Sequence, residues 1–344
     1  MKCVGSRSLA VTVSLLISFI LPLTCAGQKL TTIDPHAASS KSVEDLFNAS
    51  LSRSQLHADP PELVERAENK DFTREFVAVQ WRPGDRIYLY VVLPAKVTKP
   101  PVAIYIYGHP SDTDRFQDDG WCQRTTSGGY AAVGLVPALT GQRYNDRPMK
   151  EWFVSELQEA LGKSAHDVQM VLNYLAERGD VDMGNVGVFG GGAGGTIAVM
   201  AASVDSRIKA IDLLDPWGDW PVWMQNSAVI PDEERPAYVK PEFQKKVADF
   251  DPVKLLPALK TPRIRLNQLT DDEATPEESK KRLEAALPAT AEHHRFETSM
   301  AFYSEVASGG RVFDWLKLQI KVPDSKIREA TRETPPNAGS GSGK

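Results

Sequence analysis

Residues 186–196 read VGVFGGGAGGT, and this stretch determines how the rest of the chain is interpreted. The apolar residues 186–189 predict a buried strand, and the small and apolar residues after Gly195 predict a helix that runs to Ser203. A glycine turn between a strand and a helix leaves the backbone bare at the helix N-terminus. Three kinds of site use such a turn, namely a phosphate-binding P-loop, a dinucleotide fingerprint and a nucleophile elbow.

The first two kinds of site differ in the residues that come after the glycines. A P-loop requires a lysine after its last glycine, and Thr196 stands there, so this interpretation is excluded. The glycines of Gly190–Gly195 do satisfy G-x-G-x-x-G, and Asp215 comes 20 residues after the last of them. A dinucleotide-binding protein therefore stays open as an alternative, although such a unit usually opens its domain.

Strand and helix patterns alternate on both sides of the glycine turn. Residues 76–79 and 87–92 predict two paired strands, with Pro83-Gly84-Asp85 as the turn between them. Alternating strands and helices imply an α/β protein with a mostly parallel sheet covered on both faces. The other expected strands are 102–107, 131–136, 186–189, 208–214, 264–266 and 295–296, and the other expected helices are 151–178, 276–287 and 311–320.

The two ends of the chain carry different signals. Lys2 and Arg7 precede an apolar run from Leu9 to Leu23, and small residues come next at 24–27. This order predicts a signal peptide over 1–27 and a secreted or periplasmic protein, because the run is shorter than the roughly 20 residues that span a bilayer. We expect an N-terminal extension over 28–69, a folded domain over 70–325 with an insertion at about 215–259, and a disordered tail over 326–344.

Net charge argues against some classes of partner. The formal charge is −5, and loss of the two basic leader residues would bring it to −7. A negative protein is not expected to bind nucleic acid or an anionic membrane surface. We expect no membrane span after cleavage of the leader, no metal site and no cofactor.

A strand, a G-x-S-x-G-G turn and a helix of small residues form the nucleophile elbow of α/β hydrolases. From about Val77 to Leu318 the chain resembles that superfamily, close to its dienelactone hydrolase, acetylxylan esterase and prolyl-oligopeptidase-like groups. The resemblance implies the α/β-hydrolase fold, with a short insertion after the sixth strand. The chain departs from the superfamily pattern at Gly192, which stands where the superfamily has its nucleophilic serine.

The same resemblance suggests positions for the other catalytic groups. Asp272 falls on the triad acid. The superfamily places its histidine in a Gly-rich turn after the eighth strand, and Met300 falls approximately at that site. Gly108, His109 and Ala193 fall on the turn and the elbow that supply an oxyanion hole. Two other histidines, at 293 and 294, precede or lie within the last strand, where they would point away from the chemistry.

Loss of the serine and the histidine would remove the nucleophile and its base. We therefore predict an exported, degenerate hydrolase-like protein, non-catalytic or weakly active, that retains a ligand pocket. An esterase, acyl hydrolase or peptidase with a rearranged site remains the alternative.

Three tryptophans recur every third residue after the sixth strand, at Trp217, Trp220 and Trp223. Aromatic rings there would stack on a sugar or hold an apolar acyl group of a small-molecule or ester ligand. Equally, they would pack the insertion onto the domain. The sequence leaves both interpretations open.

Overall fold

The computed structural model describes residues 44–108, 113–138, 140, 143, 154–307 and 312–321. The predicted leader and the predicted tail lie outside these residues. Within them, no helix is long and apolar enough to cross a membrane.

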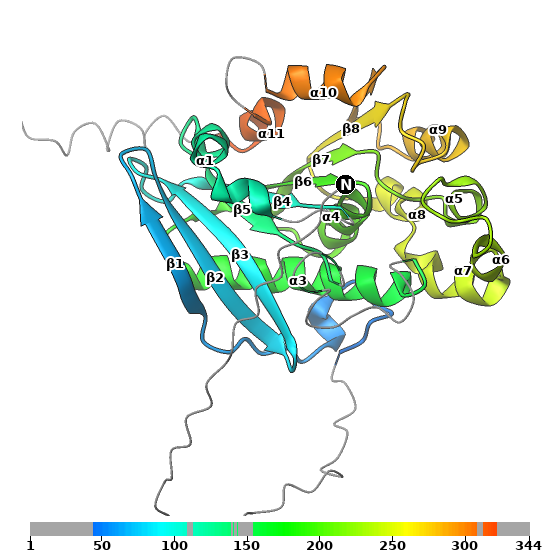
Figure 1. Cartoon of the computed structure of the whole chain (residues 1–344), viewed down its shortest axis with the longest axis horizontal. Coiled ribbons are helices and arrows are strands. Elements are labelled where there is room, and N and C mark those ends of the chain that lie inside the picture. Colours follow the sequence, from blue (N-terminus) through cyan, green and yellow to red (C-terminus); the bar gives the residue numbers. More distant parts are fainter. Residues whose placement is uncertain are drawn as a thin grey trace, which may run out of the picture. The chain divides into compact units, whose positions relative to one another are not determined.

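The described residues build a nine-stranded sheet in the order β1-β2-β3-β5-β4-β6-β7-β8-β9 (Figure 1). Strands β1, β2, β3 and β5 pair antiparallel, and every pair from β5 across to β9 is parallel. The strands are β1 (Glu62–Glu68), β2 (Phe72–Arg82), β3 (Asp85–Pro94), β4 (Pro101–Ile106), β5 (Ala131–Leu135), β6 (Asp182–Gly191), β7 (Ile208–Leu214), β8 (Arg263–Leu269) and β9 (Glu292–Phe296). The predicted α/β class and the predicted β2–β3 hairpin are confirmed.

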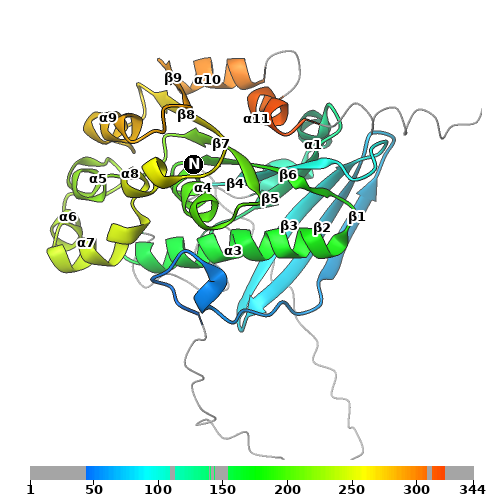
Figure 2. The same ribbon diagram turned by 180° about the vertical axis from the view of Figure 1, so that it is seen from behind.

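Helices cover both faces of the sheet, with α3 and α4 on one side and α1 and α11 on the other (Figures 1 and 2). The helices are α1 (Asp119–Thr126), α3 (Leu157–Arg178), α4 (Ala193–Val204), α5 (Trp220–Asn226), α6 (Arg235–Tyr238), α7 (Pro241–Val247), α8 (Pro252–Leu255), α9 (Glu277–Ala285), α10 (Ser299–Val306) and α11 (Asp314–Gln319). Short 3-10 turns lie at Leu51–Arg53, Asp114–Gln117, Ala248–Phe250 and Leu256–Ala258.

Strand β4 shows why the sheet needs two helical layers. Its side chains alternate between the faces, as they do in any strand. Val102, Ile104 and Ile106 join the core cluster that contains the residues of α3 and α4. Ala103 and Tyr105 join a second cluster with residues of α1 and α11. A strand that is apolar at every position is therefore buried on both sides.

Among the elements that were not expected from the sequence, two change how it is interpreted. Strand β1 lies within residues 28–69, the stretch expected to be an N-terminal extension, and it pairs with β2 along its length. Helix α10 replaces the turn expected after the last strand. Thr298 begins it, because its hydroxyl accepts a hydrogen bond from the Ala301 amide at 3.2 Å.

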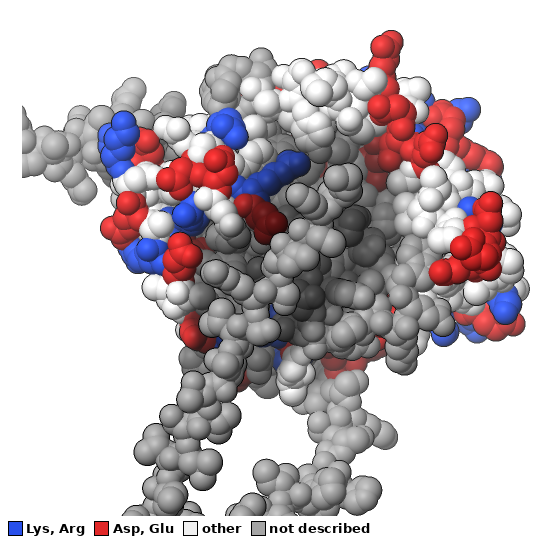
Figure 3. Space-filling view, in the orientation of Figure 1, with Lys and Arg blue, Asp and Glu red and all other residues white. Residues whose placement is uncertain are grey.

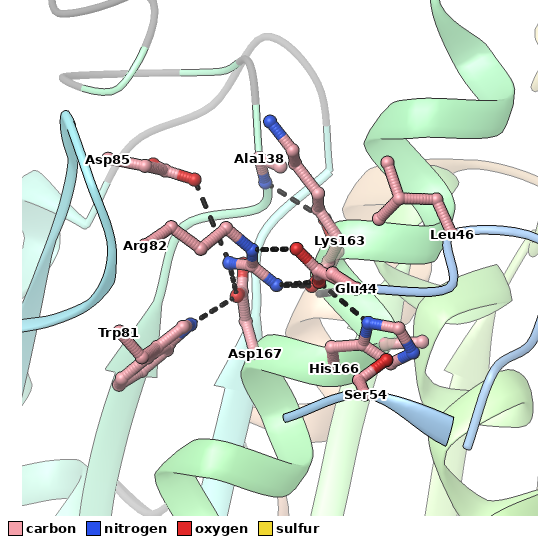
Figure 4. A network of polar contacts seen from close by, with 12 residues as sticks. Glu44, Leu46, Ser54, Trp81, Arg82, Asp85, Ala138, Lys163, His166 and Asp167 are labelled. Atoms are coloured by element: carbon pink, nitrogen blue, oxygen red, sulfur yellow. Dashed lines mark hydrogen bonds and ion pairs between the residues drawn. The ribbon is translucent and has the colours of Figure 1, made fainter. Parts of the chain in front are cut away.

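An ion-pair network is buried between β2, α3 and the segment that precedes β1 (Figure 4). Arg82 binds both Asp167 and Glu44. Arg143 binds the same Asp167 at 2.6 Å, and the Trp81 indole donates to it at 2.8 Å. The Asp167 carboxylate, which is fully buried, is thus surrounded by donors.

The network attaches residues 44–51 to α3. His166 on α3 contacts the Glu44 carboxylate through Nδ1 and the Asn48 carbonyl through Nε2, both at 2.7 Å. One turn further, Gln169 donates to the Ala49 carbonyl at 2.7 Å. Residues that precede the first strand are therefore part of the folded unit.

Charge is unevenly distributed over the face shown in Figure 3. Acidic side chains gather over α9 and the α5–α6 region, at the right of the view, whereas both signs mix around β1–β3 and α1 at the left.

Candidate active site

The turn between β6 and α4 is a tight elbow. Gly192 has φ 53° and ψ −124°, a conformation that side-chain-bearing residues rarely adopt. The surrounding backbone is crowded. A Cβ on Gly194 would lie 3.0 Å from the carbonyl carbon of Ile106, and one on Gly108 would lie 2.7 Å from the Gly191 carbonyl oxygen. Glycines at these positions let β4, β6 and α4 meet at one point.

Trp217 lies over the elbow. A Cβ built on Gly192 would stand 3.3 Å from the Trp217 indole nitrogen. The Trp217 amide donates to the Gly192 carbonyl at 3.3 Å, and Thr196 donates to the Trp217 carbonyl at 2.6 Å. The indole therefore occupies the space beside the position where an elbow side chain would begin.

A cavity of about 350 Å³ opens at the elbow. It lies at the carboxyl ends of β4, β6, β7 and β8, the edge at which α/β sheets bind ligands. Most of its wall is aromatic or aliphatic. The lining residues that matter below are Tyr105, Tyr107, Gly108, Trp121, Phe189, Gly192, Asp215, Trp217, Asp272, Tyr303 and Phe313.

The prolyl oligopeptidase family model matches residues 150–302, less than half of the chain, and this match includes the elbow and strands β6 to β9. The chain has the α/β-hydrolase fold. The resemblance stated from the sequence is thereby confirmed at that level. A comparison with curated proteins finds no match.

Solved structures with the α/β-hydrolase fold resemble this protein over most of its length. An acetyl xylan esterase from Paenibacillus sp. R4 has a TM-score of 0.60 and 19% identity, covering 74% of this chain and 87% of that chain. Acetyl xylan esterase 1 from Thermoanaerobacterium sp. JW/SL YS485 has a TM-score of 0.58 and 15% identity, covering 73% and 87%. An S-formylglutathione hydrolase from Agrobacterium tumefaciens has a TM-score of 0.55 and 15% identity, covering 76% and 100%. Because the identities are below 20%, these structural matches show a shared α/β-hydrolase fold and nothing more specific.

Four of the site residues predicted from the sequence line this α/β-hydrolase cavity, namely Gly108, Gly192, Trp217 and Asp272. The Asp272 carboxylate accepts hydrogen bonds from the amides of Ala274 and Thr275, at 3.3 and 2.9 Å, which hold it at the end of β8.

The two remaining oxyanion-hole candidates are Ala193, at the elbow, and His109, which follows Gly108 in the sequence. Ala193 is buried at the first position of α4, and its amide nitrogen is 3.7 Å from a Cβ built on Gly108. His109 lies outside the described residues.

Met300 does not lie where the sequence suggested a histidine would. Its side chain is 73% exposed, because Met300 stands on the outer side of α10 rather than in a turn. Tyr303, one helical turn later, lines the cavity instead. The described residues that line the cavity include no histidine.

Trp220 and Trp223 are also displaced from the predicted pocket. They are 1% and 0% exposed and do not line this cavity. Trp223 packs on Trp217 with ring centroids 4.8 Å apart, and Trp220 meets Trp223 edge-on at 5.6 Å. Both rings on α5 face the protein interior, where Trp223 packs against Trp217. The two rings therefore pack the insertion onto the domain.

Asp215 is a titratable lining residue to which sequence reasoning assigned no role in this cavity. It comes directly after β7, is 5% exposed and has φ 40°, an uncommon backbone conformation for a residue other than glycine. The Leu269 amide donates to its carboxyl group at 3.0 Å. Burial, with the nearby Asp272 charge, raises the pKa of Asp215 to about 7. The sequence offered Asp215 only as the acidic residue of a dinucleotide site.

Proposed function

We propose that this protein is an exported member of the α/β-hydrolase superfamily that binds a small molecule at the elbow without serine-hydrolase chemistry. The observation that carries the proposal is Gly192. The elbow has the strained backbone that presents a nucleophile in this fold, yet it bears no side chain. Export rests on the predicted leader over 1–27.

The chemistry that remains at the elbow is limited. Acyl transfer by a triad needs a hydroxyl to attack and a base to take its proton. Asp272 stands at the cavity, but none of the lining residues described is an imidazole that it could orient. Loss of a triad member leaves only binding and oxyanion-hole effects, which amount to a residual roughly 10³–10⁴-fold acceleration over water.

Asp215 favours a second candidate, an esterase or other acyl hydrolase with a rearranged site. A carboxylate with a pKa of about 7 is suited to general-base catalysis at neutral pH. In this scheme Asp215 would accept a proton from a water molecule while the water oxygen attacks the acyl carbon. No covalent intermediate with the protein would form.

One experiment separates the two candidates. The full chain is treated with a fluorophosphonate probe, and hydrolysis of p-nitrophenyl acetate is followed for wild type, Asp215→Asn and Glu273→Gln. Glu273 is an exposed neighbour of the cavity residues and serves as the matched control. Under the binding proposal no residue is labelled, and any residual rate above that of buffer is the same in all three proteins.

Other results have distinct meanings. Turnover that Asp215→Asn abolishes and Glu273→Gln retains would replace the binding proposal with the rearranged site. Stoichiometric labelling of any residue would overturn both, since it would reveal a covalent nucleophile. Export is tested separately, by mass spectrometry of the secreted or periplasmic protein, in which no peptide from Leu9 to Leu23 should occur.

A further inference from the structure

The cavity wall at β4 and α1 contains polar atoms for which the described residues provide no partner. The hydroxyl groups of Tyr105 and Tyr107 and the indole N–H of Trp121 are buried, and within the described structure none has a hydrogen-bond partner. All three residues line the cavity. Tyr105 is only 2% exposed. Nine buried side-chain atoms of the described residues have no partner, and three of them gather around this one cavity, which indicates that something in the cavity pairs with them.

Aromatic rings surround these groups. Phe313 lies 4.3 Å from Phe189 and 5.0 Å from Tyr105 between ring centroids, and the Trp121 ring meets Phe313 edge-on at 6.3 Å. We call Tyr105, Tyr107, Trp121, Phe189 and Phe313 the aromatic wall. Such a wall presents flat apolar surface with a few polar atoms set into it, which suits a planar apolar ligand with little polar surface.

Phe313 itself is held in an unfavourable conformation. Its φ is 55°, which is an outlier for a bulky side chain, and it directly precedes α11. Strain of this kind persists where the surroundings fix it, and it is common at ligand-binding positions. The strained backbone here holds a ring of the aromatic wall at the cavity.

The charge of the wall points to a neutral ligand. Burial raises the pKa of Tyr105 and of Tyr107 well above the ordinary tyrosine value, so both remain uncharged hydroxyls. The charged residues of the cavity lie outside this wall: Arg115 is exposed and stands over the Trp121 ring at 5.5 Å, and the other two are Asp215 and Asp272.

We propose that the aromatic wall binds a small, neutral aromatic compound that carries a hydroxyl group, with the ring against Phe189 and Phe313 and the hydroxyl paired with Tyr105 or Tyr107. This deepens the proposed function, because it names the class of ligand for the same cavity. A sugar fits this wall less well, since its hydroxyl groups on every side would meet apolar rings.

The test uses 4-fluorophenol and fluorobenzene, which differ only in the hydroxyl group, with binding to the full chain followed by ¹⁹F NMR. Wild type should bind 4-fluorophenol about tenfold more tightly, the typical effect of pairing a buried group that otherwise has no partner. Tyr105→Phe and Tyr107→Phe each remove one oxygen atom. In at least one of them the preference should fall to about twofold or less, while fluorobenzene still binds. Tyr88→Phe, on a residue that does not line the cavity, should keep the wild-type preference.

Three results would overturn the inference: equal affinity of the two probes for wild type, an unchanged preference in both cavity variants, or no binding of either probe. Displacement of 4-fluorophenol by methyl xyloside at lower concentration would also overturn it, in favour of a sugar site. If one cavity variant does not fold, the relative affinity of wild type for the two probes still tests the inference. Neither probe can be hydrolysed, so these outcomes are independent of whether the protein proves to be an enzyme.

Discussion

Asp167 and Asp215 are both buried aspartates, 0% and 5% exposed, and their surroundings shift their pKa values in opposite directions. Asp167 lies in the ion-pair network beside α3. Although burial opposes its ionisation, Arg143 and Arg82 lower its pKa to about 2. Asp215 lies at the cavity, where burial and the Asp272 charge raise its pKa to about 7.

The opposite pKa shifts show that buried polar groups have different roles in the ion-pair network and at the cavity. Beside α3, the guanidinium groups and the Trp81 indole saturate a carboxylate, so the network serves the fold. At the elbow, a carboxyl group has one amide donor, and two tyrosine hydroxyls have no partner at all within the described structure. Unpaired groups destabilise a protein, and they are retained where a ligand or a reaction uses them.

Asp167→Asn should produce the largest effect of the changes considered. It leaves two buried arginines facing a neutral amide, and removal of one partner from a buried ion pair costs roughly 3–5 kcal/mol. We expect a loss of unfolding free energy near the upper end of that range, measured by urea denaturation at pH 7. Because the folded pKa is lowered, the wild-type advantage should shrink as pH falls from about 4 towards about 2. An unaltered denaturation midpoint would show that the network contributes nothing to stability.

Asp215→Asn should stabilise the folded protein at high pH, whereas Asp167→Asn destabilises it. The folded protein holds a proton on Asp215 that the unfolded chain releases above its ordinary pKa of 3.8, so wild-type stability falls as pH rises from about 4 to about 7. The full pKa change corresponds to on the order of 4 kcal/mol. Asparagine mimics the protonated acid, so the variant should be more stable than wild type at pH 8 and similar at pH 4. Parallel stability curves for the two proteins would rule out the raised pKa.

Gly192→Ser should destabilise the protein by about 2 kcal/mol, because a non-glycine residue at this φ is strained and its Cβ meets the Trp217 indole. It should gain almost no activity on p-nitrophenyl acetate, since none of the described residues that line the cavity is a histidine that could take the proton of the new hydroxyl. Adding Tyr303→His should raise the rate more than adding Met300→His, because residue 303 lines the cavity and Met300 faces solvent. Equal rates for the two double variants would contradict this placement of α10.

Tyr105→Phe should have the smallest effect on stability. Among the described residues the hydroxyl has no partner to lose, so we expect a change of unfolding free energy within about 1 kcal/mol, in the stabilising direction. Thermal denaturation in the absence of ligand is the measurement. A loss of about 2 kcal/mol or more, as expected for a paired buried group, would show that the hydroxyl has a partner in the free protein.

The sequence predicted the parts of this molecule that depend on local pattern. The β2–β3 hairpin is explained by alternating apolar residues around Pro83-Gly84-Asp85, and the elbow by a strand, a glycine cluster and a helix. Helix α10 was missed although Thr298 is a recognisable N-cap, because the superfamily pattern suggested a turn there. That error placed Met300 rather than Tyr303 near the cavity.

The remaining site features depend on contacts between distant segments, which a single sequence does not reveal. The raised pKa of Asp215 arises from its burial and from the charge of Asp272, which comes more than 50 residues later in the chain. The inward position of Trp220 and Trp223 is set by how α5 packs, although their spacing suits a pocket wall equally well. Spacing along the chain shows which side chains share a face, and the packing partner decides which way that face is turned.

The attachment of Glu44 to α3 has a consequence for the order in which the chain assembles. Glu44 and His166 are 122 positions apart, so Glu44 is synthesised long before α3, the helix that it contacts. Closing so large a loop is entropically costly, and such contacts form late in folding. Glu44 should therefore be among the last residues to reach its native position, and until then the Arg82 guanidinium lacks one of the carboxylates that pair with it.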